Sequence, residues 1–296
     1  MLDFTILGGK HRKNTIDYLK QEHLPVDEGG RSRYYDIVIT CTDLVIQQNI
    51  TGKKMILVQE GMMEPEGLTY HLVRTFNLPR YLANTAATGL SDAYDLFCVA
   101  SPGYRSLFIQ KGVKPEKITV TGIPNFDHFS KYKENDFPYR HYVLAATSNS
   151  REVFKPDNRE EFIRKVAGIA AGRQIIFKLH PNENEMRARA EIERFARGAL
   201  IYEEGNIHHM VANCDVLVTQ TSSVTFIGLA MNKEVHSDLN LSQLRYLMPI
   251  QNEGTSAYHI ADLCRQLACQ PRSSVQPRNQ QPHPSFSLKK IVDSIQ

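Results

Sequence analysis

The sequence predicts an α/β protein made of two doubly wound, Rossmann-like domains that face each other across a cleft. Short runs rich in Val, Ile and Leu alternate with amphipathic segments along the 296 residues. Strands that are apolar on both faces are typical of parallel sheets covered by helices on each side. A chain of this length also suits two domains of ordinary size better than one small domain.

The alternation can be followed from one end of the chain to the other. β-rich runs are expected at residues 5–8, 35–42, 53–60, 95–101, 117–123, 142–148, 173–180, 199–204 and 214–221. Helical patterns lie between them at 14–24, 103–112, 158–171, 184–196, 206–213 and 223–232. Strands that alternate with helices in this way indicate βαβ units.

The polar segment KYKENDFPYRH interrupts this rhythm at residues 131–141. We therefore predict a first domain over residues 1–135 and a second over 140–270. The remaining residues, 271–296, are rich in Pro, Gln and Ser and are expected to form a strap or linker. Their last part, SLKKIVDSIQ, is expected to form a short terminal helix.

Composition narrows the class of protein. The charge is nearly balanced, with 35 basic and 32 acidic residues, and there is no dense basic stripe, so no nucleic-acid partner is expected. The five cysteines form no CxxC pair and are expected to be reduced thiols, which fits a cytoplasmic protein. The N-terminal MLDFTILGGKHRKN lacks the apolar run of a signal peptide, and no window is apolar enough to span a membrane.

Ligands of open α/β sheets sit beyond the carboxyl ends of the strands, so the residues that follow each strand are the candidates. Glu60 ends the run KKMILVQE and is followed by Gly61, where the backbone can turn sharply. Two interpretations are open for Glu60: it caps the next helix, or it points into the cleft as a general base.

His180 ends the run RQIIFKLH and precedes Pro181. Proline restricts the residue before it to extended conformations, so His180 is expected to be held rigidly at the strand end. There it either donates a hydrogen bond to an anion or is satisfied by neighbouring backbone. Lys178 alternates with His180 on one face. It either adds positive charge there or is a solvated or snorkelling lysine, and the second interpretation is preferred.

Two further loops follow strands in the second predicted domain. Thr221, Ser222 and Ser223 precede the apolar helix VTFIGLAMN, where hydroxyl groups either cap the helix or bind a phosphate. The loop Glu204-Gly205-Asn206 is placed to hold a base or ribose. No metal site is expected, and the GxGxxG, GxxxxGK[ST], GxSxG and HExxH signatures are absent, as is any Asp-x-Asp pair.

Three stretches, VQEGMMEPEG, FKLHPNE and QTSSVTF, occur in an order that resembles glycosyltransferases of the GT-B type. They resemble the bacterial sialyltransferases and Kdo transferases, which use CMP-activated sugars and carry an acidic pair before glycine, a His-Pro motif and a Ser/Thr-Ser motif. Gln59 departs from this pattern, because it stands where an acidic residue is usual. The region of about residues 35–240 is also similar to CDP-glycerol glycerophosphotransferases and to UDP-GlcNAc 2-epimerases.

The resemblance implies a role for each candidate. The catalytic residues would be Glu60, which would take a proton from an acceptor hydroxyl, and His180, which would stabilise the leaving phosphate. It implies neither a metal nor a cofactor. The substrate-binding residues would be Pro181, Glu204, Asn206, Thr221, Ser222 and Ser223, with the hydroxyl groups on the phosphate and the Glu204 loop facing the nucleoside.

Three functions follow as alternatives. The first is a metal-independent glycosyltransferase that moves a sugar from CMP-Kdo or CMP-sialic acid to a cell-surface glycan, such as a capsule or lipopolysaccharide. The second is a CDP-glycerol-type phosphotransferase or a UDP-GlcNAc 2-epimerase-like enzyme, and the third is a non-catalytic nucleotide-sugar-binding protein. The first implies a nucleotide-sugar donor, a glycan or lipid-linked acceptor, and a cytoplasmic protein that associates peripherally with the inner membrane face.

Several other residues are weaker candidates. The segment 64–89 is expected to form either a helical wall for the acceptor or an amphipathic helix with a solvated face. Residues that are candidates for that wall or for the rim of the cleft are Tyr70, His71, Arg74, Arg80, Tyr81, Arg105, Asn125 and Asp127.

Overall fold

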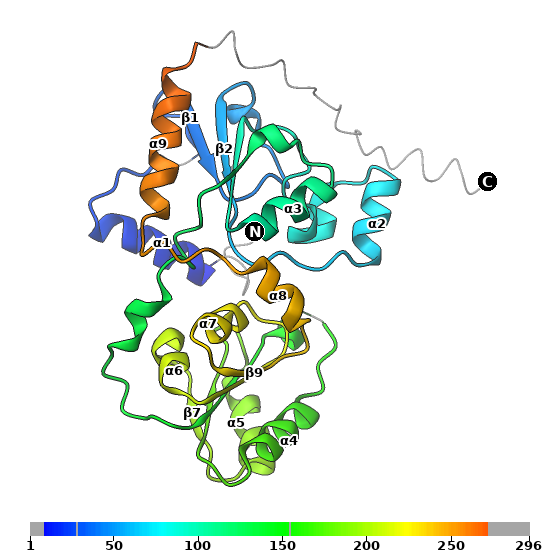
Figure 1. Cartoon of the computed structure of the whole chain (residues 1–296), viewed down its shortest axis with the longest axis vertical. Helices are drawn as coiled ribbons and strands as arrows, with labels where there is room; N and C mark the ends of the chain where they lie inside the picture. The colour runs from blue at the N-terminus through cyan, green and yellow to red at the C-terminus, as the bar shows by residue number, and fades with distance from the viewer. Residues whose placement is uncertain (1–8, 28, 154, 272–296) are drawn as a thin grey trace, which may run out of the picture.

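The computed structural model describes residues 9–27, 29–153 and 155–271, which form two parallel sheets placed one above the other (Figure 1). The first sheet has four strands in the order β1-β2-β3-β4: Ile37–Thr40, Lys54–Val58, Leu96–Val99 and Ile118–Val120. The second has five in the order β7-β6-β5-β8-β9, where β5 is Val143–Ala146, β6 Ile175–Lys178, β7 Leu200–Tyr202, β8 Val216–Thr219 and β9 Glu234–His236. We refer to the two sheets with the helices against them as the first and second halves.

Helices cover both sheets and explain why the central strands are mostly apolar. Every residue of β2, β5 and β8 is buried, as expected for strands between two helical layers. The α-helices are α1 Gly9–Gln21, α2 Leu68–Thr75, α3 Pro102–Gln110, α4 Arg159–Ala170, α5 Glu185–Phe195, α6 Ile207–Asn213, α7 Val224–Ala230, α8 Leu241–Leu247 and α9 Ser256–Cys269. The short 3₁₀ segments are η2 Gln48–Ile50, η3 Arg80–Ala87, η4 Pro115–Lys117, η5 Phe129–Lys133 and η6 Ser150–Val153.

Asparagine begins four of the helices in the second half. The side-chain oxygens of Asn158, Asn184, Asn206 and Asn240 each accept a hydrogen bond from a backbone N–H in the first turn of α4, α5, α6 and α8. Such caps satisfy donors that have no partner inside the helix. These helices therefore start where the loops after the strands end, at the edge of the sheet where the candidate residues lie.

The expected elements from residue 35 onward are present, and the fold is α/β as predicted. β9, α8 and α9 were not predicted, because β9 has only three residues and lies at the sheet edge, and the two helices follow the last predicted strand–helix unit. The expected strand at 5–8 and the terminal helix within 271–296 fall outside the described residues. Among the described residues, no helix combines the length and apolar character needed to cross a bilayer.

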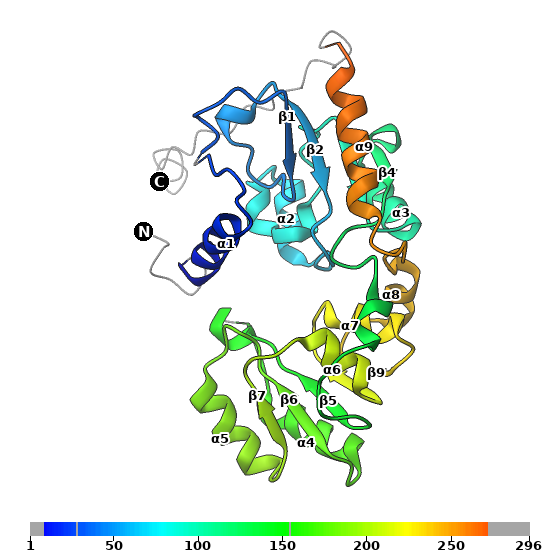
Figure 2. The ribbon, with the colours of Figure 1, turned by 90° about the vertical axis from the view of Figure 1, so that its left-hand side faces the viewer.

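The predicted division at 135–140 falls between β4 and β5, but α9 returns to the first sheet although it lies within the predicted range 140–270. Figure 2 shows α9 running along that sheet. The buried Lys54 of β2 donates from Nζ to the backbone carbonyls of Leu267, at 2.8 Å, and Ala268, at 3.0 Å. Carbonyls at a helix C-terminus lack partners within the helix and attract a cation, so Lys54 fixes the end of α9.

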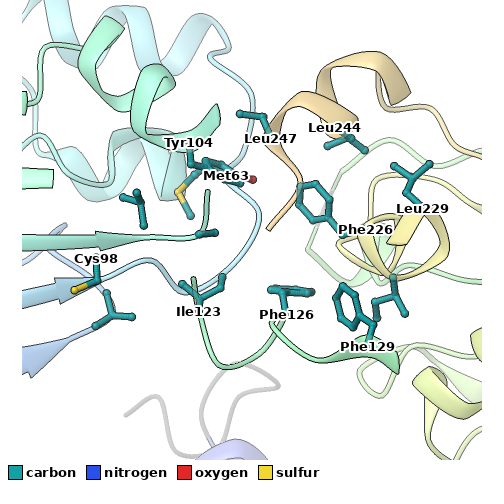
Figure 3. Packing of buried hydrophobic residues seen from close by; sticks show 14 of the residues in the cluster. Met63, Cys98, Tyr104, Ile123, Phe126, Phe129, Phe226, Leu229, Leu244 and Leu247 are labelled. Atoms are coloured by element: carbon teal, nitrogen blue, oxygen red, sulfur yellow. The ribbon is translucent and has the colours of Figure 1, made fainter. Parts of the chain in front are cut away.

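One apolar cluster joins the two halves (Figure 3). Phe226 of α7 meets Tyr104 of α3 and Phe126 of the crossover, with ring centroids 6.4 and 6.1 Å apart. Leu244 and Leu247 of α8 belong to the same cluster. A continuous packed core resists hinge motion more than a solvated linker does, so the halves are held in a defined relative position.

The contact between α3 and α8 leaves no room for a side chain at Gly103. A Cβ atom there would lie 2.1 Å from the backbone oxygen of Tyr246. The hydroxyl of Ser101, which caps α3, also donates to the backbone oxygen of Leu247 at 3.0 Å. The start of α3 and the end of α8 are thus in direct backbone contact.

Gly103→Ala should destabilise the protein, because the added methyl collides with backbone that cannot rotate away. We expect a loss of about 1–3 kcal/mol in the free energy of unfolding, measured by urea denaturation. Gly168→Ala is the matched control, because Gly168 lies in α4 and a Cβ atom added there would have no neighbouring atom within 4 Å. It should be neutral or stabilising by up to about 1 kcal/mol. Equal stability of the two variants would contradict the tight contact.

Candidate functional site

The candidate residues of the second half lie after β6, β7 and β8, on both sides of β5, where the strand order reverses. The chain runs outward from β5 through β6 to β7, then returns to the other side of β5 as β8 and β9. Such a switch point is where ligands bind in open α/β sheets. The loops after β6 and β8 carry His180 and Thr221–Ser223, and the loop after β7 carries Glu204–Asn206.

His180 is half-buried and held by hydrogen bonds on three of its atoms. Its backbone N–H donates to Oγ1 of Thr147 at 3.1 Å, and its carbonyl accepts from the N–H of Glu183 at 2.9 Å. The ring Nδ1 accepts from the N–H of Asn182 at 3.2 Å. Because Nδ1 accepts, the proton of the neutral imidazole resides on Nε2. Pro181, between these residues, is exposed.

A buried ionic cluster, which the sequence did not reveal, lies beside His180. The carboxylate of Glu183 accepts from the Thr147 hydroxyl at 2.5 Å and pairs with Arg159 at 2.7 Å. Its side chain is fully buried, and burial raises its pKa while the charge of Arg159 opposes that rise. Losing one member of a buried pair leaves an uncompensated charge, so the pair is held as a unit.

The ionic cluster extends to the loop after β5. Arg159 also pairs with Asp157 at 3.2 Å, and Arg151 makes two contacts with Glu191, at 2.7 and 2.9 Å. Gln220, after β8, donates to Asp157 at 2.7 Å. The ends of β5, β6 and β8 are therefore tied together by side chains. The signal available in the sequence was Glu183, which lies inside FKLHPNE, together with the polar run from Asn149 to Glu161.

The hydroxyl residues before α7 were expected either to cap this helix or to bind a phosphate, and Ser223 does not cap it. Ser223 occupies the N-cap position but its side chain makes no capping hydrogen bond. The Ser222 hydroxyl accepts from the N–H of Val224 at 3.3 Å instead, and the Ser222 carbonyl accepts from the N–H of Thr225. Thr221 is exposed, and both serines are half-buried.

The loop after β7 is exposed at Glu204 and Asn206, but Asn206 also has a structural role. Its Oδ1 accepts from the N–H of His208 at 2.9 Å and so begins α6. Lys178 was interpreted as a solvated or snorkelling lysine, and that interpretation is wrong. It is buried, its Nζ donates to the carbonyls of Leu179 and Glu203 at 2.9 and 2.8 Å, and burial lowers its pKa.

In the first half, Glu60 is exposed directly beyond β2. Cys41 follows the neighbouring strand β1, and its thiol pKa is raised by burial and, next, by the charge of Glu60. Asn125 of the crossover donates from Nδ2 to the backbone oxygen of Glu60 at 3.2 Å. The carboxylate of Glu60 thus stands at the carboxyl edge of the first sheet, next to the crossover between the halves.

Gln59, which departs from the acidic pair of the families that the sequence resembles, has a structural reason to be neutral. It is buried, its amide donates to the Gly61 carbonyl at 2.8 Å, and its oxygen accepts from the Ala100 N–H at 2.9 Å. A carboxylate accepts hydrogen bonds but has no N–H with which to bind the Gly61 carbonyl. Gln59 therefore holds the turn that presents Glu60.

The carboxyl edges of the two sheets face each other. Glu64, four residues beyond Glu60, pairs at 3.0 Å with Lys155 in the loop after β5. Not every candidate for the rim lies there. Asp127 is buried, with its carboxylate on the N–H of Ser256 at 3.0 Å, so it begins α9 and is not a rim residue. Arg105 is exposed on α3.

Metal-ligating side chains do not cluster in the part of the chain that the structure describes: no group of three or more His, Cys, Asp or Glu is placed to hold an ion. The five cysteines are unpaired, and Cys98 and Cys214 are buried. The adjacent His208 and His209 contact the ring of Tyr132 from η5, at 4.3 and 6.0 Å between centroids. Burial lowers the pKa of His208.

Comparison with known proteins identifies the fold. No protein-family model and no curated protein matches the sequence. Among solved structures, UDP-GlcNAc 2-epimerase from Neisseria meningitidis bound to UDP-GlcNAc is similar with a TM-score of 0.51 and 12% identity, over 86% of this chain and 80% of that one. The MnaA–UDP structure from S. aureus has a TM-score of 0.50 and 15% identity, over 90% and 73% of the two chains.

This chain has a GT-B fold. The two parallel sheets and the similarity to these epimerases agree on it, as predicted. At 12–15% identity, the similarity establishes the fold and leaves the activity to be tested. The wall teichoic acid polymerase TagF is also similar, with 13% identity over 79% of this chain and 72% of that one, but its TM-score of 0.46 is too low to support an argument.

Thr147→Val tests the support of His180. Valine keeps the shape of threonine but removes the hydroxyl that binds the His180 N–H and the Glu183 carboxylate. We expect a loss of about 1–3 kcal/mol in the free energy of unfolding, because two buried groups lose a partner. Thr147→Ser keeps the hydroxyl and should cost less than half as much in the same urea titration. A larger loss for Thr147→Ser than for Thr147→Val would assign the role of Thr147 to its methyl group.

Proposed function

We propose that this protein is an enzyme that acts on a nucleoside-diphosphate sugar, with UDP-GlcNAc as the first candidate. The observation that carries this proposal is the state of His180. Its Nδ1 is engaged by backbone, so its neutral ring has the donor proton on Nε2, at the switch point of the second sheet. A fixed donor at that position suits a phosphate oxygen on which charge develops as a bond to the sugar breaks.

The spacing of the strands supports a diphosphate over a single phosphate. β5 lies between β6, which carries His180, and β8, which is followed by Ser222 and Ser223. Two strand spacings amount to roughly 10 Å. A diphosphate can reach toward both strand ends, whereas a single phosphate contacts both only if the side chains converge on it. In this arrangement, Glu204 and Asn206 beyond β7 face the nucleoside, and Pro181 and Thr221 line the phosphates.

Glu60 is the proposed base. It is exposed at the carboxyl edge of the first sheet. Asn125 binds its backbone oxygen and Gln59 binds that of the adjacent Gly61, so both hold the backbone rather than the carboxylate. A carboxylate that does not serve to hold the fold together is available to accept a proton from a substrate. Epimerisation at carbon 2 of the sugar requires such a base, because a C–H bond must break and form again on the opposite face.

A second candidate function is transfer of the sugar to an acceptor hydroxyl, where Glu60 deprotonates that hydroxyl. The order of the three motifs favours it, and its donors are CMP-Kdo, CMP-sialic acid or, for phosphotransfer, CDP-glycerol. The acceptor is then a glycan or lipid-linked glycan of a capsule or lipopolysaccharide.

The third candidate function is that of a non-catalytic protein that binds a nucleotide sugar. It differs from the other two because it would show no turnover.

The first test is a thermal-shift panel of UDP-GlcNAc, UDP, CMP, CDP and GDP against wild type, His180→Ala and the control His259→Ala on the exposed surface of α9. At about 100 times its dissociation constant, a ligand stabilises by roughly 2.7 kcal/mol, or several degrees. We expect a shift with UDP ligands that His180→Ala loses and His259→Ala keeps. A shift with CMP alone would move the assignment to CMP-sugar transfer, and no shift with any nucleotide would refute the site.

The second test follows turnover of UDP-GlcNAc by ¹H NMR, first without acceptor. Appearance of a second anomeric signal would establish epimerisation, and turnover only after a glycan acceptor is added would establish transfer. In either reaction we expect Glu60→Gln to lower kcat by about 10²- to 10⁴-fold, as for loss of a general base, while UDP still binds. Unchanged kcat would remove Glu60 from the mechanism.

A further inference from the structure

Helix α2 carries apolar side chains on two opposite faces. Tyr70 and Val73 are buried against the alanines of η3. Leu68, Leu72 and Phe76 follow at intervals of four residues, so they share the opposite face. That face is exposed: 85% of Leu68 and 66% of Phe76 is accessible to solvent. A helix that is apolar on both faces is typical of one covered on both sides.

The exposed apolar surface continues past the end of α2. Leu78, Tyr81 and Leu82, from the turn and the start of η3, are exposed as well. We call these six residues (Leu68, Leu72, Phe76, Leu78, Tyr81 and Leu82) the α2 surface. In Figure 1, α2 lies at the outer edge of the first half, on the side away from α1 and α9. Large apolar side chains that are exposed in such number within residues 68–82 indicate an interaction site, whereas single exposed apolar residues are ordinary.

The segment that carries the α2 surface is basic. Residues 67–91 contain Arg74 and Arg80 but no Asp or Glu. The two carboxylates that border this segment are both paired with lysines, Glu66 with Lys111 at 3.8 Å and Asp92 with Lys114 and Lys117 at 2.7 and 2.6 Å. Arg74 and the adjacent His71 are exposed, and Arg80 is half-buried. The surface is therefore apolar at its centre with basic groups alone within its own segment.

We propose that the α2 surface docks onto an anionic phospholipid bilayer. The bilayer interior takes up Leu and Phe side chains, the interface suits the amphipathic ring of Tyr81, and anionic headgroups attract Arg74. A second copy of the chain fits less well. A two-fold contact brings the same residues of both copies together. Residues 67–91 offer no carboxylate to neutralise two approaching arginines, and the bordering Glu66 is already paired with Lys111.

The α2 surface begins only a few residues after the candidate base in the sequence. Glu60 lies eight residues before Leu68, on the segment that joins β2 to α2. If the proposed activity holds and includes transfer, a lipid-anchored acceptor is the class of acceptor that this placement favours. The docking itself rests only on the α2 surface, and its test uses no nucleotide.

The chain contains no tryptophan, so one introduced tryptophan reports on a single place. Phe76→Trp puts the reporter on the α2 surface. Met186→Trp is the matched control on α5 of the second half, where Met186 is 81% exposed. With vesicles of phosphatidylglycerol and brominated phosphatidylcholine, we expect a blue shift and quenching for Phe76→Trp and neither for Met186→Trp.

Leu72→Asp, added to Phe76→Trp, should weaken the partition into these vesicles by roughly tenfold or more. Its melting temperature should stay unchanged, because Leu72 faces solvent. Absence of quenching at Phe76→Trp, or equal quenching at Met186→Trp, would overturn the proposal. Equally strong binding to vesicles of phosphatidylcholine alone would overturn its electrostatic part. A concentration-dependent dimer in light scattering, without vesicle binding, would assign the surface to a second copy instead.

Discussion

The packed contact between α3, α7 and α8 is the constraint on which the rest of the structure depends. Gly103 lets the backbone of α8 approach the first turn of α3, and Phe226 fills the space between Tyr104 and Phe126. This contact fixes how one sheet stands over the other. Because both sheets then present their carboxyl edges to each other, Glu60 and His180 lie on facing edges although they are 120 positions apart in the sequence.

Within the second half, a buried ionic cluster performs the positioning that apolar packing cannot. Loops after parallel strands have few ladder hydrogen bonds, so their conformation must be set by side chains. Here Thr147 and Glu183 hold the backbone of His180, and Arg159 and Gln220 connect that support to the neighbouring strand ends. The cost of burying these charges is offset only while all partners are present, which makes the arrangement specific rather than merely stabilising.

Several lysines in this fold bind the backbone carbonyls at the ends of helices and strands. The buried Lys54 and Lys178 and the half-buried Lys233 each donate to two or more backbone carbonyls at the end of a helix or strand. Their charges therefore contribute little to the outer surface, and a net charge of +3 counted from the sequence says little about where positive potential lies. Arg74 on α2 differs from these lysines, because it is exposed and its charge does contribute to the outer surface.

The sequence by itself determined the α/β class, the strand order along the chain and the strand ends that carry Glu60, His180 and Ser222. These follow from local periodicity and from Pro and Gly, whose effects act over a few residues. Tertiary structure alone decided three matters. It returned α9 to the first sheet, buried Lys178 and Asp127, and assembled Arg151, Asp157, Arg159 and Glu183 beside His180. Each depends on which distant backbone or charge a side chain meets, and a local pattern carries no information about that.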